Sequence, residues 1–155
     1  MRLSPPAGGA MWREVDKGGE LIDGVHVPAG FDVGTSMYAI HYNEAYYPDP
    51  YTFIPERWIV GPEHSSEEVE RAQRAWNPFS IGPGGCIGRG LALMEISLTT
   101  VKLMRTLRAR DPVGHVGEGH PGANDGRHRV NEFQLEDHLT SQKDGPMLEF
   151  RKREL

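Results

Sequence analysis

A glycine-rich loop that runs directly into an apolar stretch is the feature that most constrains this chain. The loop, residues 77–90, reads Asn-Pro-Phe-Ser-Ile-Gly-Pro-Gly-Gly-Cys-Ile-Gly-Arg-Gly and holds the only cysteine of 155 residues. Glycines let a backbone turn without a Cβ clash and approach a flat ligand closely. A cysteine just before a helix lies near unpaired N–H groups and the positive end of the helix dipole, which favour a thiolate. The loop therefore predicts a metal-binding cysteine, Cys86, with the ring of Phe79 covering its sulfur.

The residues after the cysteine predict the best helix of the chain, over 87–108. Apolar side chains return near one face with helical spacing, and others widen the stripe. These residues are Leu91, Met94, Ile96, Leu98, Val101, Leu103, Met104 and Leu107. A helix this apolar is expected to pack on several sides.

Composition limits the remaining possibilities. The 19 glycines and 12 prolines make up a fifth of the 155 residues, so much of the chain is expected to be turn and irregular structure. The net charge of −5 comes with no basic stripe, which argues against a nucleic-acid partner. One cysteine excludes an internal disulfide and suits a reducing compartment. The sequence has no apolar run long enough for a transmembrane segment, and its N-terminus lacks the apolar core of a signal peptide.

Shorter elements are predicted before the loop. Residues 19–34 indicate an antiparallel hairpin that turns at Asp23-Gly24, followed by a third short strand near residues 31–33. Residues 35–47 have helical periodicity, with Thr35 or Ser36 as N-cap. Residues 63–76 predict a short solvated helix capped by Ser65 or Ser66.

The C-terminal part is expected to contain little helix. Residues 111–130 predict a loop, and its three histidines, His115, His120 and His128, have no accompanying carboxylate or cysteine pattern that would favour a metal site. Residues 131–155 predict a closing hairpin that turns at residues 143–146.

The loop resembles the haem-binding signature of the cytochrome P450 family. Phe79, Gly82, Cys86 and Gly88 match the pattern Phe-x-x-Gly-x-Arg-x-Cys-x-Gly, in which the cysteine thiolate is the axial ligand of haem iron. Gly84 departs from the pattern, because the family usually has Arg or His there to contact a haem propionate. Another residue of this chain then supplies the positive charge for the haem propionate, or the chain holds haem less firmly. Further landmarks follow in the family's order: Pro5-Pro6, Asp23-Gly24, Pro28-Ala29-Gly30 and Pro55-Glu56-Arg57-Trp58.

The resemblance implies the C-terminal part of the cytochrome P450 fold, mainly α with small antiparallel β hairpins and a long helix after the cysteine loop. Residues 1–155 are then a single partial domain of a haem-thiolate monooxygenase. The implied cofactor is haem b, bound by Phe79, Gly82, Cys86 and Gly88, with Cys86 as the iron ligand and no catalytic residue assigned. The implied partners are a small apolar substrate, as in fungal secondary metabolism, and an NADPH-dependent P450 reductase.

The resemblance also predicts what this chain does without the rest of the fold. The intact family resides in the endoplasmic reticulum membrane, and this chain, without an anchor, is expected to be cytoplasmic if expressed alone. The family's distal helix has no counterpart here, so the chain is expected to be truncated and inactive alone. The substrate and its site of oxidation do not follow from the sequence.

In the family, the arginine of Pro-Glu-Arg joins a buried cluster with a Glu-x-x-Arg pair that comes before Pro-Pro. Arg2 occupies the position of the second of these residues, and its glutamate would precede Met1. An unpaired buried charge costs several kcal/mol. We therefore expect Arg2 to be an ordinary exposed residue and Arg57 to be exposed or paired with a nearby acid. His41 is expected to be a surface or packing residue rather than a catalytic base.

Two other functions fit parts of the sequence. Residues 84–88 also match Gly-x-Cys-x-Gly, the nucleophile elbow of a hydrolase, in which Asp111 or Asp137 and a histidine between His115 and His138 would complete a triad. No parallel-sheet pattern of alternating strand and helix precedes this elbow, and Pro83 would break the strand that should lead into it. A non-enzymatic binding fragment is the third hypothesis, for which the sequence has no positive feature.

Overall fold

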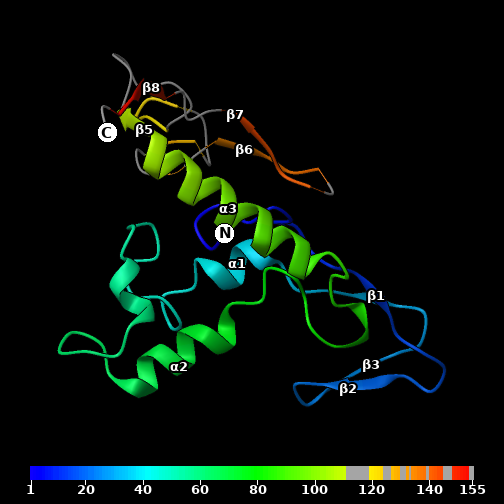
Figure 1. Cartoon of the computed structure of the whole chain (residues 1–155). Coiled ribbons are helices and arrows are strands. Elements are labelled where there is room, and N and C mark those ends of the chain that lie inside the picture. The colour runs from blue at the N-terminus through cyan, green and yellow to red at the C-terminus, as the bar shows by residue number, and fades with distance from the viewer. Residues whose placement is uncertain are drawn as a thin grey trace. The chain divides into compact units, whose positions relative to one another are not determined.

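The computed structural model describes residues 1–110, 119–123, 127–129, 132, 134–138, 140–144 and 148–153. The chain divides into two compact units, Met1–Pro78 with Asp137–Gln142, and Phe79–Glu136 with Lys143–Leu155 (Figure 1). That the whole chain is one partial domain stays a prediction. Much of the loop predicted over 111–130 lies outside the described residues.

The hairpin predicted near the N-terminus is confirmed. Strands β2 (Glu20–Ile22) and β3 (Val25–Val27) pair antiparallel, with Ile22 opposite Val25. Asp23 and Gly24 both have positive φ, 48° and 79°, as a two-residue turn of the mirror-image type requires. The sequence signal was local, and the observed structure follows it.

The third strand is also found, with a partner that the sequence did not indicate. Strand β4 (Asp32–Val33) pairs antiparallel with β1 (Arg13–Glu14), so that Arg13 lies opposite Val33. Each of these strands has two residues, which is too short for an alternating pattern to be recognised.

Helix α1 spans Met37–His41 and is shorter than the predicted 35–47. Ser36 is its N-cap, because the Ser36 side chain accepts a hydrogen bond from the Ala39 amide. Beyond the helix, the Asn43 side chain accepts from the Ala45 amide at 2.8 Å. An asparagine that bonds its neighbouring backbone in this way favours a turn over continued helix.

Helix α2 (Ser66–Ala75) confirms the prediction for residues 63–76. Ser65 and Glu68 form a capping box, in which each side chain bonds the backbone amide of the other. The buried face of α2 carries Val69 and Ala72. A 3-10 helix, η1 (Pro55–Trp58), precedes it and packs against it.

The hydrophobic core lies in the first unit. The buried valine, methionine, tyrosine and alanine residues among those described all belong to it: Val15, Met37, Tyr42, Tyr47, Val69 and Ala72. Aromatic rings connect its elements, since Tyr42 stacks between Tyr38 and Tyr51, at centroid distances of 4.4 and 4.7 Å.

The second unit is built around helix α3 (Arg89–Thr106), within the predicted 87–108. A 3-10 turn, η2 (Gly82–Gly84), precedes the helix. Strand β5 (Leu107–Arg110) follows it directly and pairs antiparallel with β8 (Glu149–Lys152). None of the α3 residues is buried, so the packing expected on several sides is absent from the described part of the chain.

The predicted closing hairpin is wrong in its pairing. Strands β6 (Gln134–Glu136) and β7 (Gln142–Asp144) form a sheet, whereas β8 pairs with β5, far away in sequence. Two strands that pair through their backbones across such a long sequence separation leave no local pattern in the sequence. As a whole, the elements agree with the predicted mixture of helices and small antiparallel sheets, and no described helix has the length and apolarity that a membrane crossing requires.

Candidate functional site

The cysteine loop is held by its own backbone. The Cys86 amide donates to the Phe79 carbonyl at 2.8 Å, which closes residues 79–86 into one loop. Inside it, the Gly85 amide donates to the Gly82 carbonyl at 3.0 Å. Gly82 has a φ of 67°, a conformation that glycine adopts without strain. The seven-residue separation of Phe79 and Cys86 in the sequence therefore corresponds to a loop that is closed by a hydrogen bond between these two residues.

The loop leads into α3 without a break. The Cys86 carbonyl accepts from the Arg89 amide at 3.3 Å, and Gly88 is the N-cap of the helix. A Cβ added at Gly88 would lie 3.8 Å from the Cys86 sulfur, in ordinary van der Waals contact. Gly88 therefore leaves space beside the sulfur that a larger side chain would begin to fill.

The residues present fit a planar cofactor that brings its own equatorial ligands. The Cys86 thiol is free and exposed. A Cβ built at Gly82 or Gly90 would meet nothing within 4 Å, so the backbone there is open to a flat ligand. One thiolate is sufficient for haem iron, because the porphyrin supplies the other donors. A thiol in this loop can therefore hold such an iron from one side.

A second cluster, in the first unit, was not anticipated. Arg2 is only 6% exposed, against the expectation of an exposed residue. Its guanidinium donates to the carbonyls of His41 at 2.9 Å, Pro50 at 2.6 Å and Thr52 at 3.3 Å. It also lies 5.1 Å from the centre of the Tyr47 ring, within the range of a cation–π contact.

Arg57 was likewise expected to be exposed or paired with an acid, and that expectation is wrong. Arg57 is 5% exposed, and its guanidinium donates only to backbone carbonyls. Those carbonyls belong to Pro48, Asp49, Thr52 and Ile54. Several carbonyl dipoles thus take the hydrogen bonds of the guanidinium, and the Thr52 carbonyl accepts from both arginines. Burial lowers the pKa of Arg57, and the charge of the nearby Asp49 partly offsets that effect. Burial, together with the charge of Arg57, lowers the pKa of Arg2.

His41 completes this arginine cluster, which we define as Arg2, Arg57, His41 and Tyr47. The His41 side chain has no exposed surface, and neither ring nitrogen has a hydrogen-bond partner. Burial, joined by the charge of Arg2, lowers its pKa to about 4. The Tyr47 hydroxyl donates to the Ala72 carbonyl at 2.8 Å, and burial raises the pKa of Tyr47 to about 12. His41 is a packing residue, as predicted, and the cluster is structural.

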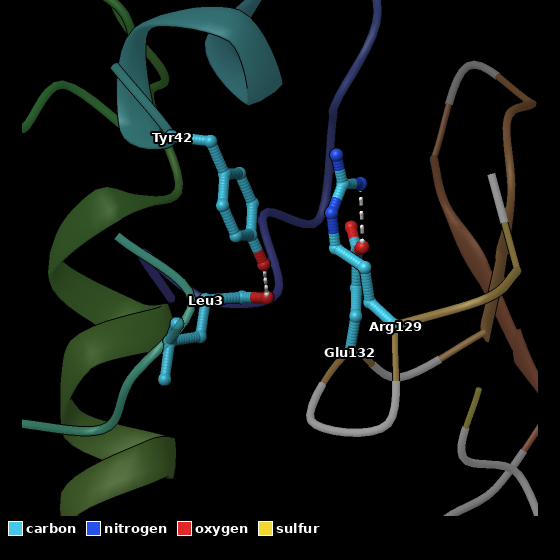
Figure 2. A network of polar contacts seen from close by, with 4 residues as sticks. All are labelled: Leu3, Tyr42, Arg129 and Glu132. Atoms are coloured by element: carbon cyan, nitrogen blue, oxygen red, sulfur yellow. Dashed lines mark hydrogen bonds and ion pairs between the residues drawn. The ribbon is translucent and has the colours of Figure 1, made fainter. Parts of the chain in front are cut away.

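Figure 2 shows one polar contact from each unit. In the first unit, the Tyr42 hydroxyl donates to the Leu3 carbonyl, which fastens the N-terminal segment to the end of α1. In the second unit, Arg129 and Glu132 form an ion pair at 3.2 Å.

The comparisons with known proteins identify the class of the chain. The family model described as Cytochrome P450 matches residues 1–116. The chain therefore belongs to the cytochrome P450 family.

Similar proteins occur in fungi. A cytochrome P450 monooxygenase of Gibberella zeae is 45% identical over 157 residues, covering 99% of this chain and 35% of the relative. Cytochrome P450 monooxygenase AKT7 of Alternaria alternata is 48% identical, covering 98% of this chain and 30% of that protein. The chain thus spans about a third of the length of these relatives.

Solved structures support the same fold. A mutant heme domain of cytochrome P450DA superposes with a TM-score of 0.72 at 22% identity, covering 99% of this chain and 30% of that chain. The cyanobacterial CYP120A1, solved with retinoic acid, superposes with a TM-score of 0.67 and covers 98% of this chain. The chain has part of the fold of a P450 heme domain.

Proposed function

We propose that this chain is the haem-binding segment of a cytochrome P450 monooxygenase, with Cys86 as the axial ligand of haem b. The observation that carries the proposal is the closed loop from Phe79 to Cys86, which presents a free, exposed thiol directly before α3. Phe79 would cover the sulfur, Gly82 would turn the loop, and Gly88 would leave space beside the iron ligand.

The chain's own residues serve chiefly to hold and shield the cofactor. A bound haem supplies the chemistry of dioxygen activation, and the intact monooxygenase would use it to oxidise a small apolar substrate of fungal secondary metabolism. Electrons would come from an NADPH-dependent P450 reductase at the endoplasmic reticulum membrane. No residue of this chain is assigned a catalytic role.

The proposal is tested by titrating the purified chain with haemin and recording the absorption spectrum, with and without carbon monoxide after reduction. We expect a spectrum typical of thiolate ligation for the wild-type chain and its loss in Cys86→Ser. Ser97→Ala, an exposed substitution in the middle of α3, is the matched control and is expected to leave the spectrum unchanged. An identical thiolate spectrum in Cys86→Ser, or no haem uptake by the wild-type chain, would refute the assignment.

The hydrolase hypothesis has less support. A nucleophile elbow requires a strand that leads into the nucleophile. The residues that lead into Cys86 form η2, a 3-10 turn, and the long helix begins three residues after the cysteine. Asp111 and His115, two of the residues considered for the triad, lie outside the described residues.

A further inference from the structure

Three oxidisable aromatic rings form an unbroken array in the first unit. The ring centroids of Trp76 and Trp58 lie 6.0 Å apart, and those of Trp58 and Tyr47 also lie 6.0 Å apart. These separations are within the range of directly interacting aromatic rings. Indole and phenol rings lose one electron more readily than most side chains, so neighbouring rings of this kind can pass an electron along.

Both tryptophans are held by regular backbone. Trp58 ends η1, which packs against α2, and Trp76 is the C-cap of α2, with its amide donating to the Gln73 carbonyl at 3.2 Å. The next residue, Asn77, donates from its side chain to the Arg74 carbonyl at 2.7 Å. Rings whose positions are fixed in this way need little rearrangement when they lose or gain an electron.

The array begins next to the cysteine loop in the sequence. Trp76 precedes Phe79 by three residues, and three residues of extended chain span about 11 Å at most. The Phe79 carbonyl in turn accepts a hydrogen bond from the Cys86 amide. No other tryptophan or tyrosine of the chain is as close to Cys86 in the sequence as Trp76 is.

Tyr47 ends the array, because it cannot release its proton. Its side chain has no exposed surface, and its hydroxyl donates to the Ala72 carbonyl, which is not a base. The Arg2 guanidinium lies 5.1 Å from the ring centre, and burial raises the pKa of Tyr47 to about 12. A phenol is easily oxidised only when its proton leaves, and a nearby cation opposes a positive ring. An electron vacancy (a hole) on the array therefore rests on the two tryptophans.

We propose that Trp76 and Trp58 form a relay that draws one-electron oxidising equivalents away from a cofactor held at Cys86. One electron leaves the Trp76 indole for the oxidised cofactor, and one electron from Trp58 refills it, with both indole N–H groups retained. A small reductant of the ascorbate or thiol class then returns an electron to Trp58. The net change is reduction of the cofactor and oxidation of the reductant. This inference rests on the proposed function only for the source of the oxidant.

The test replaces the cofactor with a photosensitiser, so that it does not require haem binding. A ruthenium polypyridyl complex is attached to the thiol of Cys86, the only cysteine of the full chain, and is oxidised by a laser flash with an external quencher. In the wild-type chain we expect the transient absorption of an indole radical. Trp76→Phe is expected to slow the formation of this radical severalfold. Trp58→Phe is expected to lower its yield severalfold, because the hole then has no second indole to occupy.

Trp12→Phe is the matched control, because Trp12 is 62% exposed and lies outside the array. It is expected to change neither the rate nor the yield, and circular dichroism checks that all variants are folded. The proposal is overturned if Trp76→Phe and Trp58→Phe behave as the wild-type chain does. It is equally overturned if Trp12→Phe slows the radical as much as Trp76→Phe, or if a tyrosyl radical forms instead. Failure of haemin binding would refute the proposed function and leave the electron transfer measured here standing.

Discussion

Acidification below pH 6.5 is expected to destabilise the first unit through His41. The His41 ring has no exposed surface and no hydrogen-bond partner, and Arg2 donates to the His41 carbonyl. A proton on this ring would add a positive charge beside Arg2 and the N-terminal amine, and Arg2 hydrogen-bonds only to backbone carbonyls among the described residues. The folded unit therefore keeps His41 neutral.

The sign of the effect follows from proton uptake. The unfolded chain protonates His41 near pH 6.5, whereas burial lowers its folded pKa to about 4. Between these values the unfolded state binds more protons, so the free energy of unfolding falls as the pH falls. The loss amounts to about 2 kcal/mol at pH 5 and levels off at about 3 kcal/mol below pH 4.

Urea denaturation between pH 7.5 and pH 4.5, followed by tryptophan fluorescence, measures this loss. Trp58 and Trp76 report on the first unit, since their rings lie 6.0 Å apart beside Tyr47. His41→Leu removes the titrating ring and two unpartnered nitrogens at similar volume. We expect its stability to equal or exceed that of the wild-type chain at pH 7.5, and its decline between pH 6.5 and pH 4.5 to be smaller by about 2 kcal/mol.

His26→Leu is the matched control, because His26 lies exposed on β3, away from the arginine cluster. It is expected to keep the wild-type pH dependence. If His41→Leu and the wild-type chain lose the same stability between pH 6.5 and pH 4.5, then His41 is not neutral in the folded state and the reasoning is refuted.

Three further predictions concern the arginine cluster and the cysteine loop. Arg57→Lys is expected to lower the free energy of unfolding by about 2–3 kcal/mol in urea denaturation, because an ammonium cannot reach carbonyls on several sides; an unchanged midpoint contradicts this. Ser80 has a φ of 59°, so Ser80→Gly is expected to raise the free energy of unfolding by about 1 kcal/mol. Gly82 has a φ of 67°, so Gly82→Ala is expected to lower the free energy of unfolding by a similar amount. Equal thermal midpoints for the two variants would contradict the strain argument. Gly84→Arg restores the charge usual in the family and is expected to tighten haemin binding about fivefold at low salt, with no gain at high salt; Gly84→Gln is the uncharged control.

The elements that the sequence predicted well are those with local signals. The turn at Asp23-Gly24 depends on two adjacent residues that accept positive φ, and the start of α2 depends on Ser65 and Glu68 three residues apart. The cysteine loop was found in the same way, from the spacing of Phe79 and Cys86. Its role in holding haem stays a proposal.

The arginine cluster was not predicted from the sequence, for a physical reason. A buried charge usually has a carboxylate partner, so the sequence predicted either exposure or an acidic partner for Arg57. Backbone carbonyls of residues 41–54 take that role, and every residue has a carbonyl, so the sequence does not indicate which ones converge. The pairing of β5 with β8 was missed for the same reason, because both strands meet through backbone groups across a long separation.

Recognition of main-chain oxygens has a consequence for how this protein can diverge. The guanidinium groups of Arg2 and Arg57 hydrogen-bond to the main-chain oxygens of Asp49, Thr52 and Ile54, and so depend on the course of the polypeptide there. Substitutions at Thr52 and Ile54 should therefore be tolerated better than insertions or deletions in the segment, whereas Asp49, with a φ of 49°, should be restricted to residues that accept positive φ. We therefore expect selection to constrain the length of this loop more tightly than its amino-acid sequence.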